Sequence, residues 1–264
     1  MEVTSHTQGA FCFAELVTPD TERARRFYGE LFGWKSVDVP ESAGSYSLFQ
    51  LRDKTVAGLR RIEHGPSRWV PYMKVEDLDT FMARVPQVGG ATLTASSEGF
   101  GLARTATFRD PGGGEAGLRE ATSHPGAELV EEPGSMWWIE LLTRDIAAVR
   151  TFYSNLVGWN AGDVRFPHLE NPYTVFKIGQ ESIAGAIEIE RNWGTLPPRW
   201  QVLFAVDDCD ARLARACALG GVNDFEPIDV ARAGRLVGIR DPANAHFVIV
   251  QAATAPVEAG VPES

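Results

Sequence analysis

Two glutamates stand in apolar stretches of the sequence and are the first candidates for chemistry. Glu15 lies in FAELVT at residues 13–18, and Glu140 lies in WIELLT at residues 138–143. Burial of a carboxyl group raises its pKa, so that it can serve as a general acid or base, or hold a ligand hydroxyl. The structural alternative is that each glutamate accepts hydrogen bonds from a neighbouring strand, loop or arginine.

These glutamates occupy equivalent positions in a long internal repeat. Residues 13–34 align without gaps with residues 138–159. Further matches follow in unbroken order: TVAGL at 55–59 with SIAGA at 182–186, RW at 68–69 with 199–200, VEDLD at 75–79 with VDDCD at 206–210, GG at 89–90 with 220–221, and RDP at 109–111 with 240–242. This order indicates duplication of a whole domain. We therefore expect domains at residues 10–122 and 135–252, a Pro-, Gly- and Glu-rich linker at 123–134, and a disordered tail at 253–264.

Four aspartates mark the expected starts of helices. Each precedes a segment with helical periodicity and can cap the first turn with its side-chain oxygens: Asp20, Asp77, Asp145 and Asp208. The first helix is expected at residues 21–32, where Gly33 supplies the usual C-terminal residue. Pro86 leaves the end of the second helix open, because proline interrupts helical hydrogen bonding.

The remaining apolar stretches have the pattern of strands. In the first copy we expect strands at residues 11–18, 46–51, 54–62, 69–75, 91–96, 103–110 and 115–120. Strands and helices are therefore mixed as βαβββ units, and the predicted fold class is α+β.

Charge and composition exclude several classes of partner. The chain of 264 residues has a formal net charge of −10 and no local cluster of Lys or Arg, so binding to nucleic acid or to an anionic membrane is not expected. Its apolar runs are far shorter than the roughly 20 residues of a membrane span, and its start is unlike a secretory signal. We expect a cytoplasmic protein with Cys12, Cys209 and Cys217 as free thiols.

The order of the motifs resembles the glyoxalase/bleomycin-resistance/dioxygenase family, the vicinal oxygen chelate superfamily. The resemblance rests on a helix ending in FY-x-x-L-x-G-W, on VEDLD or VDDCD opening a second helix that ends in GG, and on RDP before a last strand, all present in both copies. It implies two tandem domains, each of paired βαβββ modules whose mixed sheet forms a cup.

The resemblance also implies where a metal would be held. In metal-using members, a divalent ion is bound by residues of the first and last strands of the modules. Counted from the capping aspartates and the RDP turn, the equivalent positions here hold Phe13, Val70 and Gly117 in the first domain and Trp138, Gln201 and Val248 in the second. Glu188 lies near the remaining position, opposite Arg61 in the repeat. Hard divalent ions need several converging oxygen or imidazole ligands, so we expect no metal and no other cofactor.

Strand alternation indicates which side chains line the cups. If Phe13 faces inward, so do Glu15 and Val17; Val70, Tyr72 and Lys74; Trp138, Glu140 and Leu142; and Gln201, Leu203 and Ala205. His246 alternates with Val248, whereas Trp69 and Trp200 either wall a pocket or pack the core. The candidate ligand-binding residues are Phe13, Trp69, Tyr72, Trp138, Glu188, Trp200, Gln201 and His246, and the candidate catalytic residues are Glu15 and Glu140.

The preferred hypothesis is a metal-independent protein that binds a bulky apolar or aromatic small molecule. The resemblance implies a setting in natural-product biosynthesis or in self-resistance by sequestration. The alternative is a metal-independent cyclase, isomerase or lyase of secondary metabolism, in which Glu15 or Glu140 moves a proton. Delivery of a substrate to a partner enzyme is a further hypothesis, and metal-dependent glyoxalase or dioxygenase chemistry is disfavoured by the missing ligands. A monomer and a homodimer both stay open.

Overall fold

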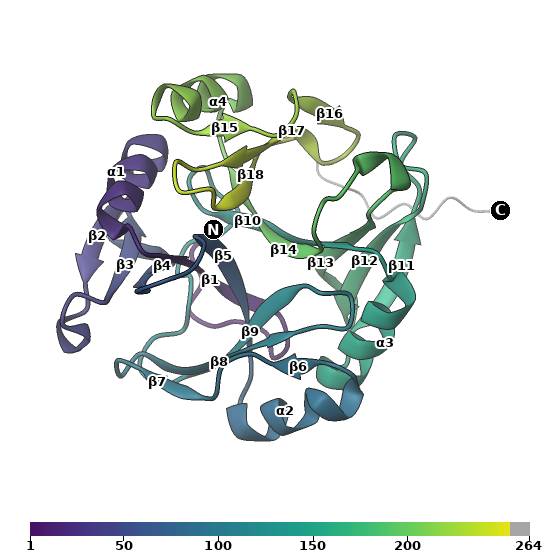
Figure 1. The fold of residues 1–264 in the computed structure, drawn as a ribbon, viewed down its shortest axis with the longest axis horizontal. Coiled ribbons are helices and arrows are strands. Elements are labelled where there is room, and N and C mark those ends of the chain that lie inside the picture. The colour runs from purple at the N-terminus through teal and green to yellow at the C-terminus, as the bar shows by residue number, and fades with distance from the viewer. Residues whose placement is uncertain (254–264) are drawn as a thin grey trace.

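Each copy of the repeat forms its own mixed β-sheet in the computed structural model, which describes residues 1–253 (Figure 1). The first sheet has the order β2-β3-β4-β1-β5-β9-β8-β6, with β7 paired to β8. The second has the order β11-β12-β13-β10-β14-β18-β17-β15, with β16 paired to β17. Below, domain one denotes residues 11–121 and domain two residues 136–252. The tail predicted at 253–264 lies outside the described residues from position 254 onward.

The secondary structure repeats in the same order in both domains. Domain one contains β1 (Phe11–Thr18), α1 (Thr21–Phe32), β2 (Lys35–Asp38), β3 (Tyr46–Leu51), β4 (Lys54–Arg61), β5 (Arg68–Lys74), α2 (Leu78–Arg84), β6 (Ala91–Thr92), β7 (Ser97–Gly99), β8 (Ala103–Arg109) and β9 (Glu115–Ala121). Domain two contains β10 (Met136–Thr143), α3 (Ile146–Val157), β11 (Asn160–Val164), β12 (Tyr173–Ile178), β13 (Glu181–Glu188), β14 (Arg199–Ala205), α4 (Cys209–Ala218), β15 (Val222–Asn223), β16 (Ile228–Val230), β17 (Gly234–Arg240) and β18 (His246–Ala252). Among residues 1–253, no helix has both the length and the apolar character needed to cross a membrane.

The two βαβββ modules of a domain lie side by side in one sheet. β1 runs antiparallel to β5, with Phe13 opposite Tyr72, and β10 runs antiparallel to β14, with Trp138 opposite Leu203. The last strands complete the arrangement, because β9 pairs in parallel with β5 and β18 with β14. Modules therefore pair within a domain and not across domains, and each sheet forms the cup that the family resemblance predicts.

The first helix begins and ends at the residues predicted from the sequence. The Asp20 side chain accepts a hydrogen bond from the backbone N–H of Arg23 at 3.0 Å, which caps α1, and Gly33 ends the helix in the left-handed region with a φ of 76°. The second helix is shorter than its pattern indicates. α2 stops at Arg84, and Pro86 starts a separate turn of 3-10 helix, Pro86–Val88, because its ring cannot continue the α-helical hydrogen bonds.

The strand predicted at residues 91–96 is wrong beyond its first two residues. β6 ends at Thr92, and the backbone N–H groups of Leu93 and Thr94 both donate to the carbonyl of Thr107, at 2.9 and 3.2 Å. Two residues then share one partner, so the regular ladder is interrupted and the chain resumes pairing only at β7.

The main core lies between the two sheets. Buried side chains from β1, β5, β14 and β18, among them Leu16, Trp69, Phe204 and Phe247, form one apolar cluster together with the helices. The helices meet across the domains: Figure 1 shows α1 beside α4, and α3 beside α2. Arg212 of α4 donates to the carbonyl of Leu31 in α1 at 2.7 Å. Each domain therefore buries its apolar face against the other, which leaves the two cups on opposite outer faces.

The motifs shared by both copies build this interdomain contact. Tyr153 of domain two donates to the buried carboxylate of Asp110 in domain one at 2.8 Å, and Tyr28 donates to Asp241 at 3.1 Å in the reciprocal pair. The indoles of Trp200 and Trp69 donate to these same two hydroxyls. The FY and RDP motifs are therefore the two ends of the cross-domain hydrogen bonds, and the RW tryptophans bind the same tyrosines from within their own domain.

The GG motif makes room for the partner domain. A Cβ atom at Gly90 would lie 2.7 Å from the ring of Phe152, so only glycine allows this ring to approach the backbone of domain one. Phe152 is fully buried and also packs on Phe108, with ring centroids 5.6 Å apart. A gap in one half thus accepts an aromatic ring from the other half.

Candidate functional site

The cup of each domain is the sheet face that points away from the interdomain core. In domain one, this face carries Phe13, Val17, Tyr46, Val70 and Tyr72, which form a second apolar cluster separate from the main core. In domain two, the corresponding cluster contains Leu203, Val248 and Val250, with Trp137, Trp138 and Leu236 packed against it. Phe13 and Trp138 thus lie in their cups, where strand alternation puts them. We call these two faces cup one and cup two.

Glu15 is held in an ion pair at the centre of cup one. Arg60 grips its carboxylate with two hydrogen bonds, from Nε at 2.7 Å and from Nη2 at 3.1 Å, and the Tyr72 hydroxyl adds a third at 3.2 Å. The negative charge of Glu15 raises the pKa of Arg60. Burial, together with that charge, raises the pKa of Tyr72 well above its ordinary value. All three hydrogen bonds are donated to Glu15 by Arg60 and Tyr72, the arrangement that the structural alternative of an arginine-bound carboxylate predicts.

Cup one is also covered by the segment that connects the domains. The backbone N–H groups of Ala127 and Glu128 donate to the carbonyls of Cys12 and Thr55 at 2.8 and 2.7 Å. The ring of His124 lies edge-on to Phe13, at a centroid distance of 6.4 Å. Together with Phe13 and Tyr72, which are 2% and 3% exposed, this segment fills the interior of cup one.

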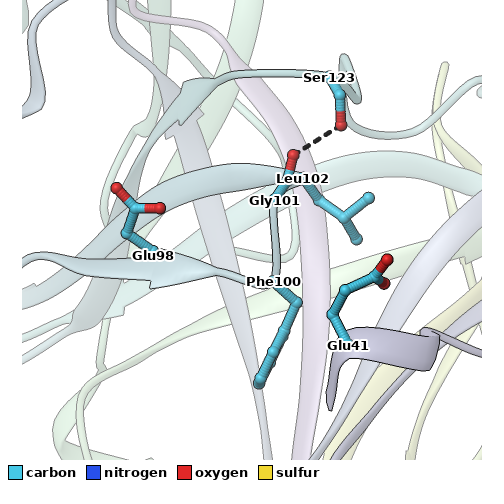
Figure 2. Close-up of a pocket in the computed structure, with 6 residues that line it drawn as sticks. All are labelled: Glu41, Glu98, Phe100, Gly101, Leu102 and Ser123. Carbon is cyan, nitrogen blue, oxygen red and sulfur yellow. Dashed lines mark hydrogen bonds between the residues drawn. The ribbon is translucent and has the colours of Figure 1, made fainter.

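A hollow of about 400 Å³ remains at the rim of cup one (Figure 2). It is lined by Glu41, Glu98, Phe100, Gly101, Leu102 and Ser123. The Phe100 ring stacks at a tilt on Tyr46, with centroids 5.5 Å apart, and so forms the floor between the hollow and the interior. A molecule in this hollow would contact Phe100 and not Glu15.

Glu140 in cup two has different neighbours from its counterpart. The repeat places Ile187 where domain one has Arg60, so no guanidinium group reaches this carboxylate. Its hydrogen bond comes instead from Gln201, whose Nε2 donates to Oε1 at 2.7 Å. Burial raises the pKa of Glu140, and the neighbouring Gln201 and Tyr173 side chains oppose this only in part. Its surroundings therefore favour the protonated form of this carboxyl group more than water does.

Cup two is less completely filled by its own side chains. Trp138, Glu140 and Tyr173 are all partly exposed, whereas the residues at the same positions in cup one are buried. The indole of Trp138 donates to the Tyr173 hydroxyl at 2.8 Å, which fixes the two rings relative to each other. Two aromatic side chains and a carboxyl group are thus accessible on one concave face, the combination that small-molecule sites commonly use.

The donors in both cups do not fit the divalent metal of the family. In cup one, the ring of Tyr72 fills the space in front of Gly117. A Cβ atom added at Gly117 would lie only 2.2 Å from this ring, so a larger side chain such as glutamate does not fit there. In cup two, the side chain of Gln201 is already bound to Glu140, and Trp138 and Val248 offer no ligand atom. Within residues 1–253, no three His, Cys, Asp or Glu side chains gather as a metal site would require.

The other predicted site residues lie outside the cups or at their edge. Trp69 and Trp200 are buried in the interdomain core, on the opposite sheet faces. Glu188 pairs in register with Thr143 at the end of β13, and alternation turns it away from the cup face that carries Ile187. His246 lies at the start of β18, where its Nε2 contacts both Arg199 and Asp224.

Sequence reasoning missed three residues that shape the cups: Tyr46, Arg60 and Tyr173. The signal for them was present in the repeat. Extending the match of TVAGL and SIAGA forward by one residue pairs Arg60 with Ile187, and carrying the same alignment nine residues back from Thr55 pairs Tyr46 with Tyr173. An arginine exchanged for isoleucine next to a shared glutamate was the indication that the two cups differ.

A Glu140→Gln variant should gain stability relative to the unaltered protein as the pH rises. The folded chain holds the Glu140 proton to higher pH than the unfolded chain, whose value is near 4.5, so the contribution of this group to stability is lost as pH rises through the folded-state pKa. Glutamine does not ionise and avoids that loss. We expect the Tm difference, variant minus unaltered protein, to increase between about pH 4 and about pH 8. A difference that stays constant would contradict the raised pKa.

Solved structures with the same architecture include a glyoxalase and several dioxygenases. The chain superposes on the Mn(II)-bound glyoxalase of Novosphingobium aromaticivorans with a TM-score of 0.64, at 14% identity, covering 92% of this chain and 82% of that one. It superposes on the 2,3-dioxygenase LapB of Pseudomonas sp. KL28 with a TM-score of 0.66, at 14% identity, covering 98% of both chains. At this identity the likeness defines the class of fold, that of the vicinal oxygen chelate proteins.

Sequence comparison defines the family more closely. The model of the glyoxalase-like domain matches residues 138–250, most of domain two. The chain is 35% identical to the anthracycline biosynthesis protein DnrV of Streptomyces peucetius, over 94% of this chain and 95% of that protein. It is 34% identical to the putative glyoxylase CFP32 of Mycobacterium bovis, over 95% of this chain and 97% of that protein. The chain belongs to the glyoxalase-like, vicinal oxygen chelate family.

Proposed function

We propose that cup two binds a bulky, largely aromatic small molecule without the help of a metal ion. The observation that carries this proposal is the contrast between the cups: the aromatic lining and the carboxyl group are accessible in cup two, whereas cup one is filled by its own side chains and by the connecting segment. Trp138 and Tyr173 offer flat apolar faces, and Glu140 with Gln201 offers hydrogen bonds to a ligand hydroxyl or carbonyl.

The setting we propose is natural-product biosynthesis or self-resistance by sequestration. Two relatives at 35% and 34% identity are named anthracycline biosynthesis proteins, and anthracyclines are fused-ring aromatic compounds, whose flat faces suit the aromatic side chains Trp138 and Tyr173. The relatives named putative glyoxylase are about as similar. The side chains at the metal positions favour the first setting, because neither cup has the ligands that a metal-dependent glyoxalase would need.

A Trp138→Leu variant should bind such a ligand at least about tenfold more weakly than the unaltered protein, since aromatic side chains at the centre of a site often contribute more than 1.4 kcal/mol. Titration calorimetry with an anthracycline aglycone, and with other fused-ring polyketides, measures this directly. Calorimetry is preferable to protein fluorescence, because the chain has seven tryptophans.

Phe13→Leu is the matched control, since Phe13 stands at the same position in cup one and is buried. It should leave the affinity unchanged. An equal loss of affinity in both variants, or no saturable binding across the panel, would contradict a ligand site in cup two.

A second candidate function is a metal-independent cyclase, isomerase or lyase with Glu140 as its general acid or base. The observation that favours it is the position of Glu140 next to Gln201 and Tyr173, where burial raises the pKa of its carboxyl group and so favours the protonated form that a general acid uses. Glu140→Gln separates the two functions. In an enzyme, this variant should lose turnover of a bound substrate while retaining affinity, whereas a pure binding protein turns over no member of the same panel.

A further inference from the structure

A second hollow, of about 250 Å³, lies between the two domains and away from both cups. The strands β5 and β14 begin beside it, and the RDP turn of domain one borders it. Its lining comes from both halves of the chain: Arg68, Trp69, Arg109, Gly113 and Glu115 from domain one, and Pro198, Arg199, Trp200 and His246 from domain two. We call it the interdomain pocket.

One ion pair of this pocket is present in domain one and has no equivalent in domain two. In domain one, Arg68 donates to both carboxylate oxygens of Glu115, from Nε at 3.1 Å and from Nη2 at 3.2 Å. The equivalent residues in domain two are Arg199 and His246. A histidine therefore replaces the carboxylate, and within residues 1–253 no carboxylate forms an ion pair with Arg199. An imidazole is neutral or positively charged, so His246 does not replace the missing negative charge, although its Nε2 contacts both Arg199 and Asp224.

A second arginine of the pocket, Arg109, also lacks the ion pair that its equivalent in the other domain forms. Arg240 of domain two pairs with Asp224 at 2.8 Å. Arg109 stands at the equivalent position in domain one, and in the described part of the chain no carboxylate lies within ion-pairing distance of it. Two guanidinium groups, one from each domain, thus border the same hollow without a carboxylate partner among the described residues; Arg199 contacts only the imidazole of His246.

Hydrogen bonding at the pocket is also incomplete. Nε of Arg199 and Nδ1 of His246 are buried and have no hydrogen-bond partner in the described structure. Buried polar atoms are normally satisfied, because leaving them unpaired costs folding free energy. Both side chains line the pocket, so its polar wall has the character of a site whose remaining partner is a bound group.

We propose that the interdomain pocket is a binding site for a small oxyanion, a phosphate or carboxylate group held by Arg109 and Arg199. The planar guanidinium group matches two oxygens of either anion and forms short, charge-assisted hydrogen bonds with them. The ion pair of Arg68 with Glu115 closes one side, and the tryptophans Trp69 and Trp200 form the apolar back wall. The pocket is smaller than a typical drug-sized site, so it suits a small acid or the acidic end of a larger molecule.

Titration calorimetry of the full chain with inorganic phosphate, and separately with malonate, tests this site at constant ionic strength set with chloride. We expect saturable binding of at least one anion, weakened about tenfold or more by Arg109→Gln and by Arg199→Gln, since each removes a charge-assisted hydrogen bond. Tighter binding of phosphate indicates a phosphorylated ligand, and tighter binding of malonate indicates a carboxylic acid.

Arg104→Gln is the matched control, because Arg104 lies on the same strand as Arg109 but is paired with Asp79 and Glu120 and does not line the pocket. Arg109 is exposed, so Arg109→Glu keeps the test open if Arg199→Gln folds poorly. No saturable binding of either anion, unchanged affinity in the Arg109 variants, or equal weakening by Arg104→Gln would overturn the proposal. Trp138→Leu should leave anion binding intact, which keeps this test separate from that of cup two.

Discussion

An Arg60→Met variant is expected to lose about 3 kcal/mol of its free energy of unfolding at neutral pH, because it leaves the Glu15 carboxylate buried without its partner. Glu15 is only 2% exposed, and Arg60 supplies two of its three hydrogen bonds. Methionine keeps much of the apolar length of the arginine side chain, so the loss is chiefly electrostatic. Urea denaturation followed by circular dichroism measures the change.

The size of this effect separates a buried ion pair from a surface one. Arg235→Met is the control, since Arg235 pairs with Asp210 and Asp229, two largely exposed carboxylates. We expect this variant to lose less than about 1 kcal/mol of its free energy of unfolding. Adding Glu15→Gln to Arg60→Met should recover part of the lost stability, because the buried charge is then gone. If Arg60→Met costs no more than Arg235→Met, the ion pair does not hold cup one together.

A Phe152→Ala variant should lose about 3–5 kcal/mol, the usual cost of removing a fully buried aromatic ring. Phe152 belongs to domain two, yet its ring fills the gap over Gly90 in domain one. The cavity therefore opens between the domains, and we expect both halves to unfold together at a lower urea concentration. The transition should be the same when followed by tryptophan fluorescence and by circular dichroism.

Phe225→Ala is the comparison for this variant, since Phe225 is 41% exposed and should change the stability by less than about 0.5 kcal/mol. A Phe152→Ala protein that unfolds in two separate steps, with one half as stable as before, would contradict the mutual dependence of the domains.

The repeat, together with the residues that begin and end its helices, predicted most of the architecture. Asp20 and Gly33 predict the two ends of the first helix, because capping by a side chain and a left-handed backbone conformation each depend on the residue type at a single position. The strands around Glu15 and Glu140 follow from alternation in the same way. The early end of α2 at Pro86 and the interruption after Thr92 were harder, because each depends on which backbone groups find partners in three dimensions.

The candidate sites were predicted less completely. Alternation put Glu15 and Glu140 in their cups, but the fate of each carboxylate depends on the neighbouring strand, where Arg60 in one copy is replaced by Ile187 in the other. For Trp69 and Trp200, the sequence left both a pocket wall and the core open. The contact between the domains decides this, because their indoles bind Tyr28 and Tyr153, whose hydroxyls donate to aspartates of the other domain. No pattern within one domain indicates what the other domain will contact.

The connecting segment that lies across cup one also sets the valency of the molecule. A tandem repeat with two open receptors could engage two guests, or two arms of one guest, and gain avidity from their linkage. Here the backbone N–H groups of Ala127 and Glu128 donate to strands β1 and β4 of cup one, so a segment of the same chain covers this cup. On the proposed function, the chain therefore offers one accessible site, cup two, and binds one guest molecule, while domain one packs against domain two and supports it.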